Sequence, residues 1–423
     1  MRITRCVTIL VLCVVISNFA SAFQSKEFYL RGKDFLDEGR YRNAIEAFNK
    51  AITTTKTHTN AELISEIHFN IGTAYFHLDD FDNAIIEYNK AIDIKSDSFI
   101  YYNALGIVFS ELKQYKKALD AYNNAIRYST KTAELYFNIG LAHYNQGNFS
   151  SAINTFKQAI SVDKKYTDAY IGLGDIYLKQ GQLSISEQNY KSVIQIKPDS
   201  LGALIGLGKV YLKQGETVKA RPFLEKVIKI QKDHTEAHFQ IAQLYIKNGE
   251  IHKAEKTMEY FKVLRDTDPL LLRAEKWIKR HPDDSKGYNN LGILYLTRRC
   301  YDKAILNYKK AITLSPNSAS VHYNMGHTYH KQGKRGLAID AYLLAIANDS
   351  ELAIAHNNLA VCYSELNEHL NKALSHALIA TKNMPTNPNY WDTLASIYTQ
   401  LGSKKEAQQA RAKQTSLLMQ SQK

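Results

Sequence analysis

The chain has 423 residues, of which 45% are hydrophobic, 22% are charged and only 7 are proline, a composition compatible with a long helical protein. The formal net charge is +13, and the basic residues are spread along the chain rather than collected in one arm. This distribution favours a diffuse attraction to anionic surfaces or acidic partners, and it argues against a dedicated nucleic-acid site.

Residues 1–22 have the three parts of a secretory signal peptide. Two arginines stand in the first five residues, the apolar run Cys6–Ile16 follows, and the sequence ASA at 20–22 offers a cleavage site before Phe23. We therefore predict an exported protein, periplasmic or secreted. An uncleaved signal anchor is the alternative, although the run is short for a transmembrane helix.

From Ser25 onward the sequence repeats itself. A small residue recurs eleven times, and an aromatic residue or a histidine stands three positions after each one. Alanine, replaced once by Ser186, marks a fixed place in the second half of each unit. The spacing from Gly72 to Ala242 is 34 residues at every step. The small residues are Gly32, Gly72, Gly106, Gly140, Gly174, Gly208, Ala242, Gly292, Gly326, Ala360 and Ala395.

The unit at 285–316 shows the pattern most fully, with Gly292, Tyr295, Ala304, Tyr308, Ala311 and Pro316. This order resembles the tetratricopeptide repeat (TPR) family, whose helix-turn-helix units have 34 residues. The resemblance implies an all-α fold, a right-handed α-solenoid of about 11 repeats. Repeats 1–7 would occupy residues 23–266 and repeats 8–11 residues 285–423. A polar capping helix would close the stack over Lys404–Ser416.

Close crossing of two helices explains the residue types in each unit. Gly292 on the first helix (A) and Ala304 on the second (B) lack bulk, so their backbones can approach. Tyr295 and Tyr308 are expected to fill the space beside that contact. Glycine in several A–B turns, such as Gly181, predicts a left-handed residue that ends helix A.

The register breaks once, because Ala242 and Gly292 are 50 residues apart. We predict an irregular helical joint over residues 267–284, with one extra short helix at 270–280 between Pro269 and Pro282. Trp277 is expected to cover the exposed face of repeat seven, since a stacking surface must be buried at an irregularity.

In TPR domains the stacked A helices line a concave groove that holds a peptide or a partner helix. The resemblance therefore directs attention to the sixth position of each repeat. A carboxamide there has both a donor and an acceptor for a peptide main chain, as in the asparagine ladder of some TPR superhelices. Alternatively, these side chains bridge neighbouring helices. The row is Asn70, Asn138, Asn290, Asn324 and Asn358, and it lapses at 104, 172, 206 and 240.

Where the asparagine row lapses, Lys179, Lys213 and Lys247 share position 13 of three successive repeats. Stacked repeats would align them as a cationic stripe suited to an acidic amphipathic segment. Ile171, Ile205 and Phe239 would lie beside the stripe as an apolar strip. The other interpretation is that each lysine faces water and stabilises a helix C-terminus.

The repeats leave no room for a catalytic domain, and no Walker loop, GxSxG, HExxH or CxxC motif occurs. We therefore predict a protein that is not an enzyme, with no cofactor. A metal site at His322, His327 and His330 is disfavoured, because no carboxylate or cysteine ligand accompanies them.

The predicted function is an exported scaffold that binds peptide or helical segments of partner proteins in its groove, within an envelope-associated assembly. The partners are expected to be proteins, with no nucleic acid and only peripheral or signal-anchored membrane association. The alternative is a component of a polysaccharide or polymer export machine that binds an anionic glycan or lipid.

Overall fold

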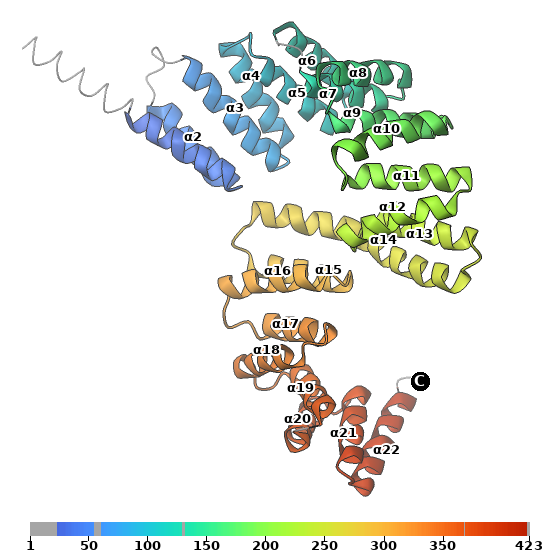
Figure 1. Ribbon diagram of the computed structural model, residues 1–423. Helices are drawn as coiled ribbons and strands as arrows, with labels where there is room; N and C mark the ends of the chain where they lie inside the picture. The colour runs from blue at the N-terminus through green and yellow to red at the C-terminus, as the bar shows by residue number, and fades with distance from the viewer. Residues whose placement is uncertain (1–22, 55–60, 129–131, 368, 421–423) are drawn as a thin grey trace, which may run out of the picture. The chain divides into compact units, whose positions relative to one another are not determined.

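The computed structural model describes residues 23–54, 61–128, 132–367 and 369–420. Every regular element in these ranges is an α-helix (Figure 1). The predicted signal peptide, residues 1–22, lies outside the described residues, as does most of the threonine-rich segment that separates the first two repeats. In the described ranges no helix is both long and apolar enough to cross a membrane.

The chain divides into two compact units, one ending at Phe261 and one beginning at Lys262. In the first unit, residues 23–37 are helical. They are followed by α2 (Tyr41–Thr54), α3 (Ala61–His77), α4 (Phe81–Ile94), α5 (Phe99–Glu111), α6 (Tyr115–Tyr128), α7 (Ala133–Asn145), α8 (Phe149–Val162), α9 (Thr167–Lys179), α10 (Leu183–Ile196), α11 (Leu201–Gln214), α12 (Thr217–Ile230) and α13 (Thr235–Lys247).

Helix α14 (Ile251–Arg280) contains the boundary between the units. The second unit continues with α15 (Ser285–Thr297), α16 (Tyr301–Leu314), α17 (Ala319–Lys331), α18 (Arg335–Asn348), α19 (Ala353–Leu366), α20 (Leu370–Asn383), α21 (Pro388–Gln400) and α22 (Lys404–Gln420).

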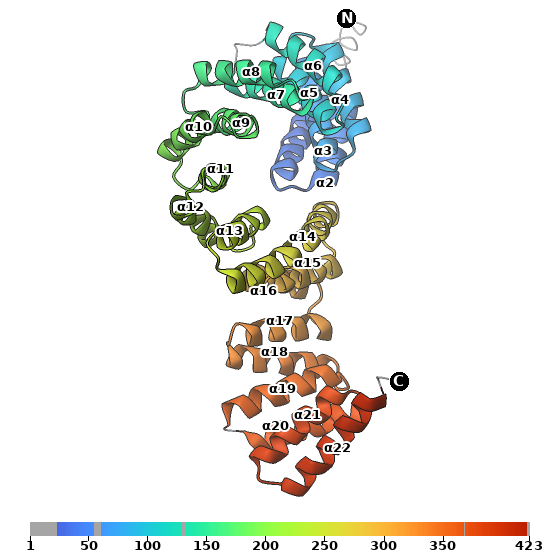
Figure 2. The ribbon, with the colours of Figure 1, turned by 90° about the vertical axis from the view of Figure 1, so that its right-hand side faces the viewer.

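Consecutive helices pair as antiparallel hairpins. In the regular repeats from α3 to α12 and from α15 to α22, each A helix packs most extensively on the B helix that follows it, as α3 does on α4, and less extensively on the next hairpin. Within each unit, successive hairpins lie side by side along the chain (Figure 2). The prediction of an all-α solenoid is confirmed, while the handedness of its superhelix stays a prediction.

The tight turn between helix A and helix B contains one residue with left-handed backbone. Seven of these residues are glycine, among them Gly181 at φ +77°. The other four are Asp79, Lys113, Arg299 and Asn367, at φ between 55° and 58°. The described chain thus has eleven such turns, one for each of the eleven predicted repeats.

An aromatic ring from helix B lies directly on the glycine of helix A in most repeats. A Cβ atom added to Gly292 would be 2.4 Å from the ring of Tyr308, and one added to Gly140 would be 2.4 Å from the ring of Phe156. Both rings are fully buried. The expectation that Tyr308 fills space beside the crossing is therefore corrected, because the ring occupies the space that the missing Cβ leaves.

Helix α14 continues through Pro269 for 30 residues in total, so the predicted separate short helix at 270–280 is wrong. Proline removes one backbone N–H and crowds the carbonyl four residues earlier, which normally ends a helix. Side-chain hydrogen bonds do not restore that lost bond, but they reinforce the turn just before it. The Thr267 hydroxyl donates to the carbonyls of Val263 and Leu264, at 2.7 and 3.1 Å.

Arg298, from the A–B turn of repeat eight, adds to these hydrogen bonds. Its Nη1 lies 3.1 Å from the Leu264 carbonyl oxygen, 2.9 Å from Thr267 Oγ1 and 2.8 Å from Asp268 Oδ1. Only 2% of Arg298 is exposed, whereas the Asp268 side chain remains 45% exposed, so the pair lies at the edge of the buried region. Sequence periodicity could not show this contact, because it joins an irregular helix to a turn.

Trp277 contacts the start of repeat eight in the structure, while its predicted coverage of repeat seven stays a prediction. Its indole Nε1 donates to Asp284 Oδ2 at 2.7 Å, and its ring lies against Gly287 at the start of α15. Half of its surface remains exposed. The last helix, α22, covers the predicted capping segment and buries Ala407 and Ala410.

Alanine substitutions separate the two roles of glycine in the repeats, which are to permit close helix contact and to adopt left-handed backbone in the turn. We expect Gly140→Ala to destabilise the protein by about 3 kcal/mol, because the new methyl group overlaps the Phe156 ring. Gly181→Ala should cost about 1 kcal/mol, since its Cβ meets no atom within 4 Å and only the left-handed backbone is strained. Guanidinium denaturation measures both. Gly336→Ala is the control, in α18 with open space and ordinary backbone, and should stabilise by ~0.5 kcal/mol.

Arg298→Met should destabilise the second unit by about 2 kcal/mol, because it removes the buried hydrogen bonds to the Leu264 carbonyl and Thr267 and the ion pair with Asp268. Arg299→Gly changes the next residue and relieves left-handed strain, so it should leave stability unchanged or raise it by ~1 kcal/mol. Thermal unfolding of both variants provides the measurement. Equal stability of the two would show that the Arg298 contacts do not support α14.

Candidate functional site

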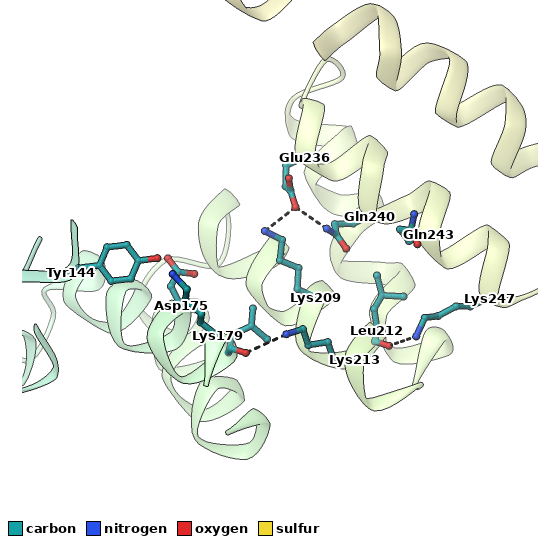
Figure 3. A pocket seen from close by; sticks show the side chains of 11 residues that line it. Tyr144, Asp175, Lys179, Lys209, Leu212, Lys213, Glu236, Gln240, Gln243 and Lys247 are labelled. Atoms are coloured by element: carbon teal, nitrogen blue, oxygen red, sulfur yellow. Dashed lines mark hydrogen bonds and ion pairs between the residues drawn. The ribbon is translucent and has the colours of Figure 1, made fainter. Parts of the chain in front are cut away.

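An open pocket of about 610 Å³ lies along the A helices of three successive repeats, α9, α11 and α13 (Figure 3). Two columns supply most of its lining, position 9 and position 13 of each repeat. Because the two positions are four residues apart, they share one face of each helix. The lining residues are Tyr144, Asp175, Leu178, Lys179, Lys209, Leu212, Lys213, Glu236, Gln240, Gln243 and Lys247.

The three predicted lysines all line this pocket, and each contacts the preceding repeat. Lys213 Nζ donates to the Leu178 carbonyl at 3.3 Å, and Lys247 Nζ donates to the Leu212 carbonyl at 2.7 Å (Figure 3). Both carbonyls are in the last turn of an A helix, where a cation is favourable. The interpretation that each lysine stabilises a helix C-terminus therefore describes the observed contacts of Lys213 and Lys247. The C-terminus that each one contacts belongs to the preceding A helix and not to the lysine's own helix.

Lys179, the first of the row, lies over aromatic rings instead. Its Nζ is 4.8 Å from the ring centroid of Phe149 and 5.8 Å from that of Tyr144. All three lysine residues remain exposed. The ammonium groups are thus fixed in direction while keeping access to solvent.

The two carboxylates of the pocket are engaged within the protein. Glu236 pairs with Lys209 at 2.8 Å and accepts from Gln240 at 2.7 Å. Asp175 accepts a 2.6 Å hydrogen bond from the Tyr190 hydroxyl. Burial, followed by the nearby Asp175 charge, raises the pKa of Tyr190, so its hydroxyl stays protonated and donates. The row of exposed lysines therefore sets the charge that the pocket presents.

Three of the predicted asparagines bridge neighbouring A helices. Asn138 Nδ2 donates to Asn103 Oδ1 at 3.2 Å, and Asn324 Nδ2 donates to Asn289 Oδ1 at 2.9 Å. Asn358 Nδ2 lies 3.4 Å from the Tyr323 hydroxyl. In each case position 6 of one repeat contacts position 5 of the repeat before it, which is the bridging alternative. Peptide binding by these residues stays a prediction.

The remaining two asparagines have opposite surroundings. Asn70 is buried, with 9% of its surface exposed, and its Nδ2 atom has no hydrogen-bond partner. Asn290 is exposed on α15 and lines a different pocket, in the second compact unit. The structure therefore does not bring the five residues together as one row of exposed carboxamides.

The predicted apolar strip is used for packing. Ile205 is buried with 7% exposure, the Ile171 side chain lies against Gly202, and the Phe239 ring packs on Phe261 at 5.2 Å between centroids. None of the three predicted strip residues lines the lysine pocket. That part of the prediction is wrong, because these side chains pack against neighbouring helices instead of lining the pocket.

Comparison with known proteins identifies the repeats. A model described as "TPR repeat" matches residues 108–147, 143–181, 174–215 and 301–333. Four further models, each described as "Tetratricopeptide repeat", match residues 29–99, 212–259, 274–305 and 319–351. The chain belongs to the tetratricopeptide repeat family. TPR proteins are generally scaffolds that bind other proteins rather than catalysts.

Several TPR structures resemble parts of this chain. YrrB, titled a TPR protein with an unusual peptide-binding site, is 23% identical, with 46% of this chain and 96% of YrrB covered and a TM-score of 0.36. PilW, a type IV pilus biogenesis factor, is 17% identical, with 50% and 96% covered and a TM-score of 0.45.

A curated relative shares a shorter stretch. The uncharacterized protein ycf37 of Guillardia theta is 25% identical over 108 residues, which is 24% of this chain. The match spans 61% of the length of that relative.

Ring nitrogens at position 4 of several TPR units contact the preceding loop, a role that sequence analysis missed. His238 Nε2, His322 Nε2 and His356 Nε2 lie 2.8, 2.8 and 3.1 Å from the carbonyl oxygen six residues earlier. Trp391 Nε1 donates to the Pro385 carbonyl in the same way, at 2.8 Å. The signal available in the sequence was the recurrence of histidine or tryptophan, side chains with a ring N–H, at position 4 of these repeats.

The other two histidines considered for a metal site have separate contacts. The ring of His327 stacks on Tyr323 at 6.2 Å between centroids, and His330 Nε2 lies 3.2 Å from Glu365 Oε2. Arg335 Nε also donates to Glu365, at 2.6 Å. Burial opposes ionisation of Glu365, but the Arg335 and His330 contacts outweigh it and lower its pKa.

A histidine pair in the second unit makes stability depend on pH. Because His356 Nε2 donates to the Ser350 carbonyl, its Nδ1 accepts from His376 Nδ1 at 2.9 Å. Burial is the main cause that lowers the pKa of His376 below 6.5, with His356 and Lys372 adding to it. A histidine with a lowered folded-state pKa stabilises the fold fully above the unfolded value and loses that contribution as pH falls below about 6.5.

We therefore expect the unfolding free energy of the second unit to fall between about pH 7.5 and about pH 5.5. His376→Gln keeps a side-chain N–H for His356 but does not titrate, so its loss of stability over that range should be smaller. Urea denaturation at both pH values measures the difference. Identical pH dependence in the wild type and the variant would contradict the assignment to His376.

Proposed function

We propose that this TPR protein is an exported scaffold that holds acidic segments of partner proteins along the lysine pocket of α9, α11 and α13. The row of Lys179, Lys213 and Lys247 carries the proposal, because it presents one exposed ammonium per repeat along one pocket. The signal-peptide pattern of residues 1–22 supports export, and an envelope-associated assembly is the setting that we infer from it.

Each ammonium can bind a partner while keeping its internal contact. An ammonium has three N–H donors, and Lys213 and Lys247 each direct one to a helix-terminal carbonyl. The other donors remain for a carboxylate. The carbonyl contact also limits the side-chain freedom that would otherwise be lost on binding, which favours affinity.

The rest of the pocket suits a polypeptide. Gln243 contributes a carboxamide, which can pair with a peptide N–H or C=O whatever the side chain. Leu178 and Leu212 line the pocket between the lysines, although only 8% and 5% of their surface is exposed, and the ring of Tyr144 lines one end (Figure 3). An acidic amphipathic segment that runs along the repeats would meet cation, amide and apolar surface in turn.

Replacing the three lysines tests the proposal. We expect Lys179→Gln, Lys213→Gln and Lys247→Gln together to abolish capture of a specific protein partner from envelope extract at moderate salt. The matched control changes Lys157, Lys164 and Lys229 to Gln, three exposed lysines outside the pocket, and should retain the partner. Both triple variants lose the same charge, so a general electrostatic effect would weaken them equally.

The salt dependence separates the proposal from the alternative of an anionic glycan or lipid. A protein partner that contacts apolar surface should remain bound, more weakly, at high salt, whereas a purely anionic polymer should be released completely. Equal capture by the wild type and the pocket variant would overturn the proposal.

A further inference from the structure

A second pocket, of about 550 Å³, lies between the C-terminal half of α14 and α15, within the second compact unit. We call it the Trp277 groove. Its walls and floor are mainly apolar, and its polar groups lie at Arg273, Asp284, Lys286 and Asn290. The apolar residues that line it are Leu270, Ala274, Trp277, Gly287, Ile293 and Leu294.

The groove exists because α14 continues beyond Pro269. On that extension Leu270, Ala274 and Trp277 are four and three residues apart, so they share one helical face. This face meets the start of α15 at Gly287, where an added Cβ would lie 2.6 Å from the Ile278 side chain and 3.1 Å from Trp277. Glycine therefore permits the close approach of the two helices.

Polar contacts hold the walls in place. Trp277 Nε1 donates to Asp284 Oδ2 at 2.7 Å, and Asp284 Oδ1 accepts from the Lys286 backbone N–H at 3.0 Å. The Tyr295 hydroxyl donates to Glu275 Oε1 at 2.8 Å, which ties α15 to α14. The Trp277 ring is thus preorganised although half of it is exposed.

Large apolar side chains are exposed at the groove beyond what the fold requires. Leu270, Trp277 and Ile293 are exposed to 46%, 50% and 39%. Exposed apolar residues gathered in one concavity with a polar rim indicate a binding surface. A volume of this size falls in the range of ordinary ligand pockets.

The charges of the groove select the occupant. Arg273 and Lys286 are exposed at the rim, while the carboxylate of Asp284 is engaged with Trp277 and with the first turn of α15. The pKa of Asp284 is lowered, chiefly by the Trp277 hydrogen bond, so it stays ionised and committed to these contacts. Arg273 and Lys286 outnumber this one carboxylate, so the lining of the groove carries a net positive charge, which favours an anionic occupant.

Asn290 distinguishes a peptide from an acyl chain. Its exposed carboxamide, the predicted ladder residue of repeat eight, lines the groove and offers both a donor and an acceptor. An extended main chain uses both, whereas a hydrocarbon chain uses neither.

We propose that the Trp277 groove binds a short acidic peptide segment of a partner protein. One apolar side chain of the segment packs against Trp277 and Ile293, flanking carboxylates pair with Arg273 and Lys286, and Asn290 bonds the main chain. This site goes beyond the lysine pocket, because it is built from other helices and lies in the other compact unit.

The probes are short labelled peptides of glutamate with one central leucine, phenylalanine, methionine or alanine. Fluorescence anisotropy with the full chain should show saturable binding, strongest for a large apolar residue and weakest for alanine. Replacing glutamate by glutamine should weaken binding by about tenfold or more. In a Trp391→Phe background Trp277 is the only tryptophan, and its emission should shift to the blue on binding.

A pair of variants on the same two helices controls the assignment. Ile293→Glu places a carboxylate in the groove and should weaken binding by ~tenfold or more. Leu272→Glu makes the same chemical change on α14 at a residue that is 57% exposed and does not line the groove, so it should leave binding unchanged. Circular dichroism checks that both variants fold.

Three results would overturn the proposal. They are failure of every peptide to bind, equal binding by the Ile293→Glu and Leu272→Glu variants, or a Trp277 shift produced by anionic lipid vesicles and not by peptides. The triple lysine variant of the other pocket should bind these peptides at the Trp277 groove with the wild-type Trp277 response. Its behaviour therefore separates failure of this inference from failure of the proposed function.

Discussion

The contact on which most repeats depend is an aromatic ring of helix B packed on a glycine of helix A. The ring of Tyr308 on Gly292, and that of Phe156 on Gly140, occupies the volume that a Cβ would take. One ring therefore fixes both the distance between the helices and their register, because only one residue on helix A can receive it. Some repeats have alanine at this position, such as the fully buried Ala360, so their helices pack closely without the contact between ring and glycine.

Regular stacking of these hairpins is what produces the lysine pocket. No single repeat forms a pocket, but equal spacing brings positions 9 and 13 of α9, α11 and α13 onto one surface. The lysines also stabilise the stacking of repeats, since Lys213 and Lys247 each donate to a carbonyl of the preceding A helix. The same side chains therefore contribute to the scaffold and to the surface that it presents, as the concave faces of solenoids commonly do.

Sequence periodicity predicted the hairpins, their number and the pocket's lysine column, because each of these follows from a repeating spacing. It did not predict the partner of a given atom. The asparagines of position 6 looked equivalent, yet Asn138 bridges to Asn103 whereas Asn290 is exposed and lines a groove with the extension of α14.

The largest error concerned the one stretch without a repeat. Pro269 suggested a helix end, but the buried Arg298 holds the backbone and side chains around it, and α14 continues. The Trp277 groove depends on that continuation. Arg298 is 29 residues further along the chain, in a turn whose sequence gives no sign of the contact, so only the folded chain could reveal it.

The bridges between repeats have a mechanical consequence. Asn138 with Asn103, Lys213 with Leu178 and Asn324 with Asn289 each join residues 35 apart, which is one repeat and one residue. Stretching the chain from its ends would therefore apply the same force to each of these interfaces in series, so that the weakest would give way first, with no long-range tie among these bridges to share the force. Each hairpin that gives way would release about 120 Å of extended chain, so this solenoid is built to lengthen in steps rather than to rupture at once.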